Sequence, residues 1–137
     1  MKKTFVLASH GGMARGIYES VKLIMGEQEN VKVICAYENG EDESISETVK
    51  EILESVPAGS DTIVLTDIYG GSINNEFMKY CVGKKIFLVS GMNLPLVIQM
   101  LTCQSLGAAE LVRTSIAEAR EGIRDCCQVN MTEEEDF

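Results

Sequence analysis

The sequence predicts an α/β protein with an open, mainly parallel four-stranded sheet and helices on both faces. Short apolar runs, rich in β-branched residues, alternate with segments in which apolar residues recur at helical spacing. Four strand–helix units in succession are typical of a parallel sheet, and right-handed crossovers leave few possible topologies. Among these we expect the flavodoxin-like strand order 2-1-3-4.

The first half of the chain supplies three of the four strands. Apolar runs predict strands at Thr4–Ser9, Val31–Ala36 and Thr62–Thr66, and the third run is apolar enough to be buried on both faces. Between the runs, helical spacing of apolar residues predicts one helix from Ala14 and a second from Ile45.

The second half of the chain continues the alternation. A third helix is predicted from about Ile73 to Cys81, and a fourth strand over Lys85–Ser90. Pro95 suits the first turn of a fourth helix that ends near Cys103, and a fifth helix is expected from about Ala109.

The C-terminal segment is predicted to add one short edge strand, Cys126–Met131. Residues 1–132 would then form a single domain, followed by an acidic tail over residues 133–137. The adjacent Cys126 and Cys127 could form a redox element, but in a reducing compartment two cysteines in a half-buried strand are the favoured interpretation.

The composition excludes several classes of protein. A net charge of −9, from 21 acidic and 12 basic residues, argues against nucleic-acid binding and favours a basic partner. No apolar run is long enough to insert into a membrane or to serve as a signal peptide, and five cysteines without a framework spacing indicate the cytoplasm. One histidine and no Cys-x-x-Cys leave no metal site, and we expect no cofactor.

The single histidine, His10, lies at the end of the first predicted strand, and glycines follow it. In the order 2-1-3-4 the first and third strands flank the switch point of the sheet, so we expect Asp67 close to His10. A carboxylate that accepts one ring N–H leaves the other ring nitrogen free as a nucleophile. The alternatives are a structural histidine and an aspartate that only caps the following helix.

Gly70-Gly71-Ser72 follows the third strand and opens a helix, a place that favours an anion. Beside His10 and Asp67, this turn suggests a phosphate held on a histidine. A Ser–His–Asp hydrolase with Ser72 as nucleophile is the rival, but the Gly-x-Ser-x-Gly elbow is missing. Neither glycine turn has the Gly-x-Gly-x-x-Gly spacing of dinucleotide binding.

An apolar collar is expected around this polar centre, as on a protein-docking face rather than in a deep substrate pocket. Its predicted members, all on loops or helix starts, are Met13, Ile68, Tyr69, Ile73 and Leu94.

Three motifs in order resemble the enzyme IIA proteins of the mannose family of the bacterial phosphotransferase system. They are Ser9-His10-Gly11, Asp67-Ile68-Tyr69-Gly70-Gly71-Ser72 and Ser90-Gly91-Met92-Asn93-Leu94-Pro95, and the likeness runs to about Met131. Family members often have Trp before the Gly-Gly pair and Pro after the Ser, where this chain has Tyr69 and Ile73.

The resemblance implies a phosphotransferase role in sugar transport. His10 would accept a phosphoryl group from the phosphocarrier HPr and pass it to an enzyme IIB, which acts with the membrane components IIC and IID. Asp67 would orient the ring, while Ser72 and the amides of Gly71 and Gly11 would hold the phosphoryl oxygens. The family is dimeric with an exchanged final strand, which makes residues 126–131 the candidate for that strand.

Two other functions stay open at this point. The phosphotransfer subunit of a dihydroxyacetone kinase looks similar around its histidine, and a non-catalytic regulatory module could use the same fold to bind a partner. The chain has no Pro/Ala-rich linker or IIB domain, so we expect a stand-alone IIA whose IIB is a separate chain. Nothing in the sequence identifies the sugar.

Overall fold

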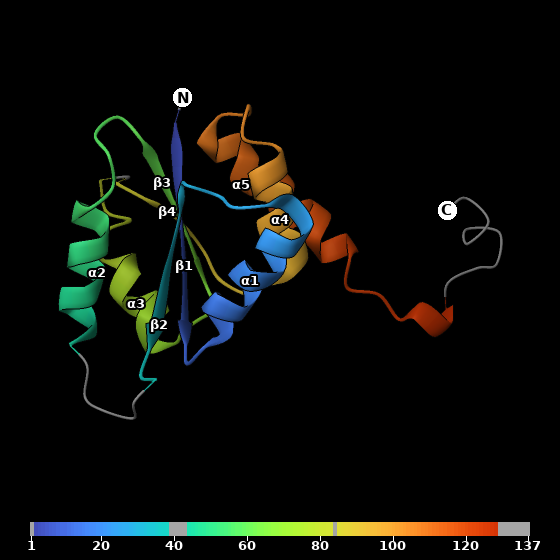
Figure 1. Cartoon of the computed structure of the whole chain (residues 1–137), viewed down its shortest axis with the longest axis horizontal. Helices are drawn as coiled ribbons and strands as arrows, with labels where there is room; N and C mark the ends of the chain where they lie inside the picture. Colours follow the sequence, from blue (N-terminus) through green and yellow to red (C-terminus); the bar gives the residue numbers. More distant parts are fainter. Residues whose placement is uncertain (1, 39–43, 84, 129–137) are drawn as a thin grey trace.

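The computed structural model describes residues 2–38, 44–83 and 85–128, in which one parallel sheet is covered by helices (Figure 1). The elements in chain order are β1 (Lys3–His10), α1 (Met13–Met25), β2 (Val31–Ala36), α2 (Ile45–Glu54), β3 (Asp61–Thr66), α3 (Ser72–Met78), β4 (Phe87–Val89), α4 (Leu94–Thr102), α5 (Ala108–Glu121) and the short 3-10 helix η1 (Cys126–Gln128). The strand order is β2-β1-β3-β4, as predicted.

The register of the sheet brings two strand ends together. β1 is paired in parallel with β2, where His10 lies opposite Ala36, and with β3, where Ala8 lies opposite Thr66. β1 therefore extends past the end of β3, and Asp67, the residue after Thr66, comes level with the last residues of β1.

The helices form two layers with a core on each side of the sheet. In Figure 1, α2 and α3 cover one face, and α1, α4 and α5 cover the other. Because side chains alternate along a strand, Phe5 and Leu7 of β1 pack into the core under α1, α4 and α5, whereas Val6 and Ala8 pack into the core under α2 and α3. All four side chains are at most 1% exposed.

Two elements are shorter than the sequence predicts. α3 ends at Met78 rather than Cys81, because the next turns are closed by tighter bonds, from the Tyr80 N–H to the Phe77 carbonyl and from the Cys81 N–H to the Met78 carbonyl. β4 is an edge strand that meets β3 over three residues only, Phe87–Val89.

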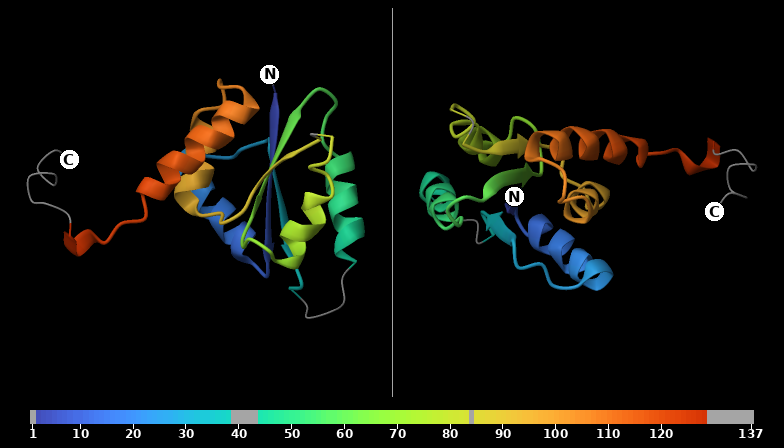
Figure 2. Two further views of the ribbon diagram at one scale, coloured as in Figure 1. Left: turned by 180° about the vertical axis from the view of Figure 1, so that it is seen from behind. Right: turned by 90° about the horizontal axis from the view of Figure 1, so that it is seen from above.

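Over the residues that the structure describes, the single chain does not form the predicted C-terminal strand. Cys126–Gln128 form a 3-10 turn, in which Asp125 accepts N–H bonds from Cys127 and Gln128. Both cysteines are exposed free thiols and not part of a half-buried strand. The segment after α5 leads away from the body of the molecule in both views of Figure 2. Residues 129–131 and the tail 133–137 lie outside the described residues.

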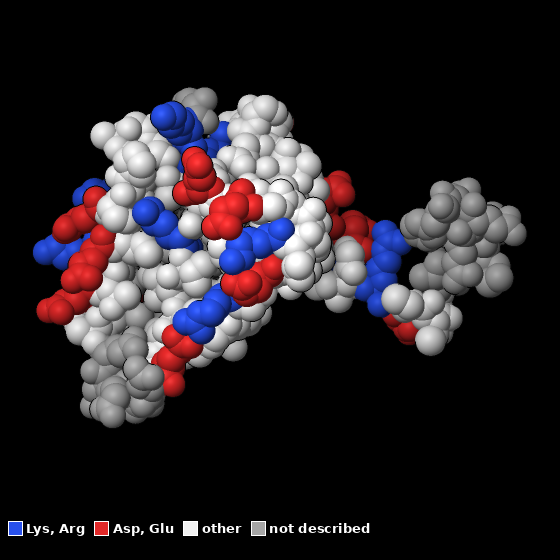
Figure 3. Space-filling model, viewed as in Figure 1, with Lys and Arg blue, Asp and Glu red and all other residues white. Residues whose placement is uncertain are grey.

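The exposed surfaces of the helices carry charges of both signs. Acidic and basic side chains lie next to one another over α1 and α2 (Figure 3). On α1, for example, Lys22 pairs with Glu19 at 3.1 Å. Within the three described ranges, no helix combines the length and the apolar character that a bilayer crossing requires.

Candidate active site

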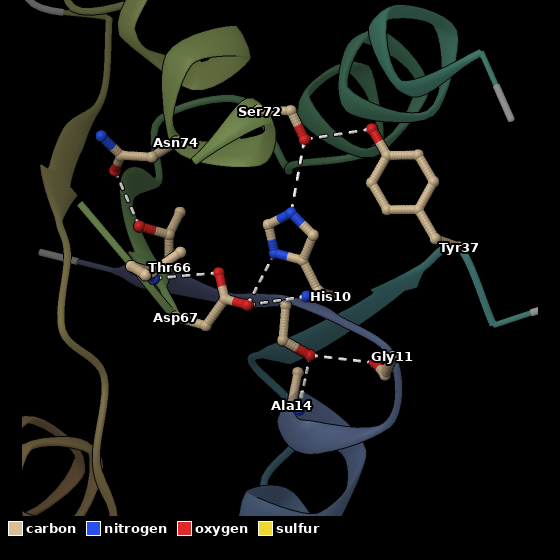
Figure 4. Close-up of polar contacts among 10 residues, drawn as sticks. His10, Gly11, Ala14, Tyr37, Thr66, Asp67, Ser72 and Asn74 are labelled. Carbon is tan, nitrogen blue, oxygen red and sulfur yellow. Dashed lines mark hydrogen bonds and ion pairs between the residues drawn. The ribbon is translucent and has the colours of Figure 1, made fainter. Parts of the chain in front are cut away.

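His10 is the last residue of β1 and its side chain is 42% exposed at the edge of the sheet. Ser9, the residue before it, is fully buried, and its hydroxyl accepts a bond from the Ala14 N–H at 2.8 Å and donates to the Gly11 carbonyl at 3.1 Å. Gly11 has φ +59°, a conformation that costs glycine little. A hydroxyl of β1 thus holds the turn after the imidazole against the start of α1 (Figure 4).

The predicted contact between His10 and Asp67 is confirmed. One carboxylate oxygen of Asp67 accepts the backbone N–H of His10 at 2.8 Å and lies 2.9 Å from ring Nδ1. The other oxygen accepts the N–H of Ile68 at 3.0 Å. Both oxygens are occupied, so the carboxylate fixes the main chain of β1 as well as the ring.

The electrostatics of Asp67 favour its charged form. Its side chain is only 11% exposed, and this burial acts to raise the pKa of the carboxyl group. The bonds from the backbone and the ring of His10 outweigh burial, and the pKa lies below its usual value. Asp67 is therefore a carboxylate at neutral pH, and it accepts a hydrogen bond from Nδ1–H.

With its proton on Nδ1, the neutral imidazole carries its lone pair on Nε2. The Ser72 hydroxyl, on the first residue of α3, lies 3.4 Å from Nε2 (Figure 4). Nε2 therefore points towards the start of α3 and away from the carboxylate.

Gly71 is needed because α3 begins so close to the ring. A Cβ at this position would lie 2.8 Å from Cγ2 of Ile68 and 3.2 Å from Cε1 of His10. Gly70, before it, has φ +78°, and its carbonyl accepts a bond from the Asn75 side chain at 3.2 Å. Glycine lets the turn approach the imidazole more closely than any other residue could.

The predicted anion cradle needs correction. The N–H of Gly11 donates to the Ala36 carbonyl at 2.7 Å, and the N–H of Gly71 donates to the Ile68 carbonyl at 3.3 Å. The Gly11 amide is thus committed to the sheet, and its predicted role as a phosphate ligand is wrong. The Gly71 amide closes its own turn, whereas the Ser72 hydroxyl lies 3.4 Å from Nε2.

Tyr37 is a site residue that sequence reasoning missed. Its ring stacks on His10, with 5.6 Å between ring centroids and 29° between planes, and its hydroxyl lies 3.1 Å from that of Ser72. A signal was available, because Tyr37 directly follows β2, whose carboxyl end reaches the same sheet edge as His10. A second missed contact, from the buried Thr66 hydroxyl to Asn74 at 2.7 Å, ties the end of β3 to α3.

The predicted docking residues divide into two groups. Met13, Ile68 and Tyr69 are exposed at 44%, 57% and 80%. Ile73 is fully buried in the core under α2 and α3, so its assignment to a docking face is wrong. Leu94 is half-buried and packs against the opposite core. The periodicity of α3 turns Ile73 inward, a direction that its position at the helix start did not reveal.

Metal ligands are not grouped anywhere in the three described ranges, where no cluster of three or more His, Cys, Asp or Glu side chains could hold an ion. The site consists of an imidazole, a carboxylate and two hydroxyls at an exposed sheet edge. Such a site can attack and carry an electrophilic group on one ring nitrogen.

The chain is thus an α/β domain in which a carboxylate holds a histidine at the switch point of the sheet. Residues 4–117, well over half of the chain, match the family described as the PTS system fructose IIA component. The chain belongs to this family, the mannose/fructose-type IIA components of the sugar phosphotransferase system, and the resemblance noted in the sequence is confirmed.

Curated relatives agree with this assignment. The mannose-specific EIIAB component of Escherichia coli K12 is 26% identical over 127 residues, which are 90% of this chain and 39% of that protein. The fructose-specific EIIA component of Bacillus subtilis 168 is 21% identical over 125 residues, 90% of this chain and 86% of that protein. The chain thus spans well under half of the length of the E. coli relative.

A solved structure from Klebsiella pneumoniae, assigned as a permease of the phosphoenolpyruvate-dependent sugar phosphotransferase system, is 38% identical. It superposes with a TM-score of 0.85 over 93% of both chains. The EIIA component from Streptococcus agalactiae is 28% identical, with a TM-score of 0.80 over 94% of this chain and all of that one.

Proposed function

We propose that this chain is a phosphoryl carrier for sugar uptake, in which His10 accepts a phosphoryl group from phospho-HPr and passes it to an enzyme IIB. The observation that carries the proposal is where the two ring nitrogens of His10 lie. Nδ1 lies 2.9 Å from the Asp67 carboxylate, while Nε2, on the other side of a ring that is 42% exposed, lies 3.4 Å from the Ser72 hydroxyl. This arrangement, in a member of the IIA family, supports Nε2 as the phosphorylated atom.

Transfer begins when the Nε2 lone pair attacks the phosphorus of the donor's phosphohistidine. The new N–P bond forms as the donor's N–P bond breaks, and that electron pair returns to the donor nitrogen. The ring of His10 then carries the phosphoryl group on Nε2 and hydrogen on Nδ1, and its positive charge is stabilised by Asp67. Donation to enzyme IIB reverses these steps.

The protein's contribution to this chemistry is position and charge. The transferred group is metaphosphate-like, so catalysis consists mainly of alignment and of hydrogen bonds to its oxygens. Ser72 lies close enough to Nε2 to donate such a bond. No metal takes part in the proposed step.

The surroundings of His10 suit a protein donor and a protein acceptor. Met13, at the start of α1, and Ile68 and Tyr69, in the turn after β3, are exposed apolar residues. A carrier must release each partner after transfer, and docking areas of modest size permit fast release. We place the exchange in the cytoplasm, with the IIB partner acting beside the membrane components IIC and IID.

We further propose a homodimer in which the C-terminal segment of one chain pairs with β4 of the other. Within the described residues, β4 is bonded to β3 on one side only, so its other edge can accept a strand. A groove of about 350 Å³ runs beside it, between β4 and the end of α5, and its lining includes Leu88, Ser90 and Ile123. Light scattering of the full chain and of a chain ending at Gly122 tests this: a dimer that survives the truncation contradicts strand exchange.

The carrier function is tested by labelling with phospho-HPr regenerated from phosphoenolpyruvate. The native chain should take up one acid-labile phosphoryl group, and His10→Ala should take up none. Glu118→Ala, on the exposed surface of α5, is the matched control and should be labelled normally. Full labelling of His10→Ala would reject the assignment.

The acceptor distinguishes the remaining alternatives. Labelled chain that phosphorylates an enzyme IIB supports the proposal. Transfer only to a dihydroxyacetone kinase subunit would instead assign the chain to that system, and a native chain that is never labelled would indicate a regulatory binding module.

A further inference from the structure

Tyr37 has a main-chain conformation that few non-glycine residues adopt. Its φ is +61°, and within the described ranges it is the only residue besides glycine with a positive φ. This left-handed conformation brings the Cβ of an L-residue close to backbone oxygen and persists only where surrounding contacts hold it. Such strain at the end of β2 calls for an explanation in terms of what the side chain does.

The Tyr37 side chain makes two contacts at the nucleophile. Its ring stacks on the imidazole of His10, and its hydroxyl reaches that of Ser72 at 3.1 Å (Figure 4). The Ser72 hydroxyl in turn lies 3.4 Å from Nε2. Three polar atoms thus form one chain: the Tyr37 hydroxyl, the Ser72 hydroxyl and the ring nitrogen.

The direction of this chain follows from the tautomer of His10. Since Nδ1–H donates a hydrogen bond to Asp67, Nε2 has a lone pair and must accept a hydrogen bond from the Ser72 hydroxyl. The Ser72 oxygen is then free to accept the hydrogen of Tyr37. When Nε2 is bonded to phosphorus its lone pair is used, and the hydroxyl hydrogens of both residues can turn to the phosphoryl oxygens.

An ion pair lies next to Tyr37 in the sequence. Glu38, the next residue, accepts two bonds from the guanidinium of Arg15, each 2.7 Å long. The pair lies over Gly12, where a Cβ would be 3.7 Å from the guanidinium and 4.0 Å from the carboxylate. It therefore joins the first turn of α1 to the residue after Tyr37, across the turn that follows His10. Bidentate pairing gives such a link a defined geometry.

We propose that Tyr37 is a positioning residue for phosphoryl transfer, whose ring orients His10 and whose hydroxyl joins that of Ser72 in binding the phosphoryl oxygens, and that the Arg15–Glu38 pair keeps it in place. This inference rests on the proposed carrier function. It adds a second hydroxyl donor to the site, supplied by a different strand from those that carry His10 and Asp67.

The first experiment compares Tyr37→Phe, which keeps the ring and removes the hydroxyl, with Tyr37→Leu, which removes both. One hydrogen bond to a charged group corresponds to about tenfold or more in rate, so Tyr37→Phe should slow labelling by phospho-HPr at least about tenfold and shorten the lifetime of the phosphohistidine. Tyr37→Leu should lose more. Tyr80→Phe, in the turn after α3, is the matched control and should change neither, because Tyr80 packs against the core under α2 and α3 but makes no contact with His10.

The second experiment reads the His10 ring directly by NMR. Stacking shifts the Hε1 resonance of His10 upfield, so Tyr37→Phe should keep this shift and Tyr37→Leu should lose it. Arg15→Gln and Glu38→Gln should each reduce the shift and the transfer rate, and the double variant should lose little more than either single one, because both remove the same ion pair.

The outcomes separate the two proposals. If the native chain is labelled and Tyr37→Phe is labelled at the same rate with an unchanged phosphohistidine lifetime, the role of Tyr37 is overturned and the carrier function stands. An Hε1 resonance that is the same in native chain and Tyr37→Leu overturns the role of the ring. A native chain that phospho-HPr does not label overturns the carrier function, and the role of Tyr37 with it.

Discussion

Replacing Asp67 by asparagine tests how the ring of His10, our proposed nucleophile, is prepared. The carboxylate accepts three N–H bonds, from the backbone and the ring of His10 and from the backbone of Ile68. Asparagine has only one oxygen, so its NH₂ group must face either the N–H donors of His10 or the N–H of Ile68. If NH₂ faces His10, the ring can no longer keep hydrogen on Nδ1 and the tautomer with a proton on Nε2 is favoured, which removes the nucleophilic lone pair. If it faces Ile68, the ring loses a charged partner.

Either arrangement removes at least one hydrogen bond between a charged group and the ring. Such a bond contributes about 1.5–3 kcal/mol, so phosphoryl transfer should slow by about 10- to 150-fold. The free energy of unfolding should fall by about 1–3 kcal/mol, since a donor is left facing another donor. Rapid-quench labelling measures the rate, and nitrogen-15 NMR of the imidazole reports the tautomer.

The native rate in an Asp67→Asn protein whose ring had changed tautomer would refute this reasoning. It would mean that Nε2 does not need the carboxylate, and that Asp67 serves only the main chain of β1. Asp61→Asn, at the start of β3, is the matched control, because Asp67 directly follows the other end of this strand.

Three further predictions follow from the same geometry. The pKa of Asp67 is lowered in the folded state, so its contribution to stability is present above the unfolded pKa of about 4 and is lost as the pH falls through the folded pKa. The free energies of unfolding of the native and Asp67→Asn chains, measured by urea titration, should therefore converge in acid. Gly71→Ala should displace the imidazole and reduce labelling. Gly16→Ala, on α1 with open space at its Cβ, should raise the free energy of unfolding by about 0.5–1 kcal/mol and leave labelling unchanged. Equal labelling of the two variants would contradict the close approach of the Gly71 turn to the ring of His10. Ile73→Ala should lower the free energy of unfolding, measured by thermal unfolding, by about 2–4 kcal/mol, because its side chain is buried. Ile68→Ala, at an exposed position, should lower it by less than about 0.5 kcal/mol while weakening binding to HPr. The reverse ranking would contradict the burial of the two side chains.

The position of the site could be predicted because it depends on topology. His10 and Asp67 are 57 residues apart, yet both follow apolar runs that read as parallel strands. In the order β2-β1-β3-β4 the ends of β1 and β3 must be neighbours. Strand order alone therefore places the carboxylate beside the ring, with no knowledge of side-chain packing.

The parts that could not be predicted depend on particular tertiary contacts. Tyr37 has a φ of +61°, and no local pattern in the sequence indicates a left-handed tyrosine. Glycine amides look available in the sequence, but that of Gly11 is taken by Ala36 on the adjacent strand. The alternating apolar residues after Asp125 suggested a strand, but in the single chain Cys126–Gln128 have no strand to pair with and form a 3-10 turn.

The register of β1 decides whether the imidazole faces outward at all. A one-residue slip of this strand would exchange the faces of Ser9 and His10. Burial of apolar side chains penalises such a slip weakly, because β1 is covered on both sides by apolar cores. The polar ends of the strand supply the missing specificity: Lys3 is 4% exposed and donates to the Gln104 carbonyl at 2.7 Å, and the buried Ser9 hydroxyl accepts from Ala14 at 2.8 Å. A slipped strand would leave these buried polar groups without partners, at a cost of about 1–3 kcal/mol for each. The exposed imidazole of His10 is therefore held in place by the buried polar residues at the two ends of its own strand.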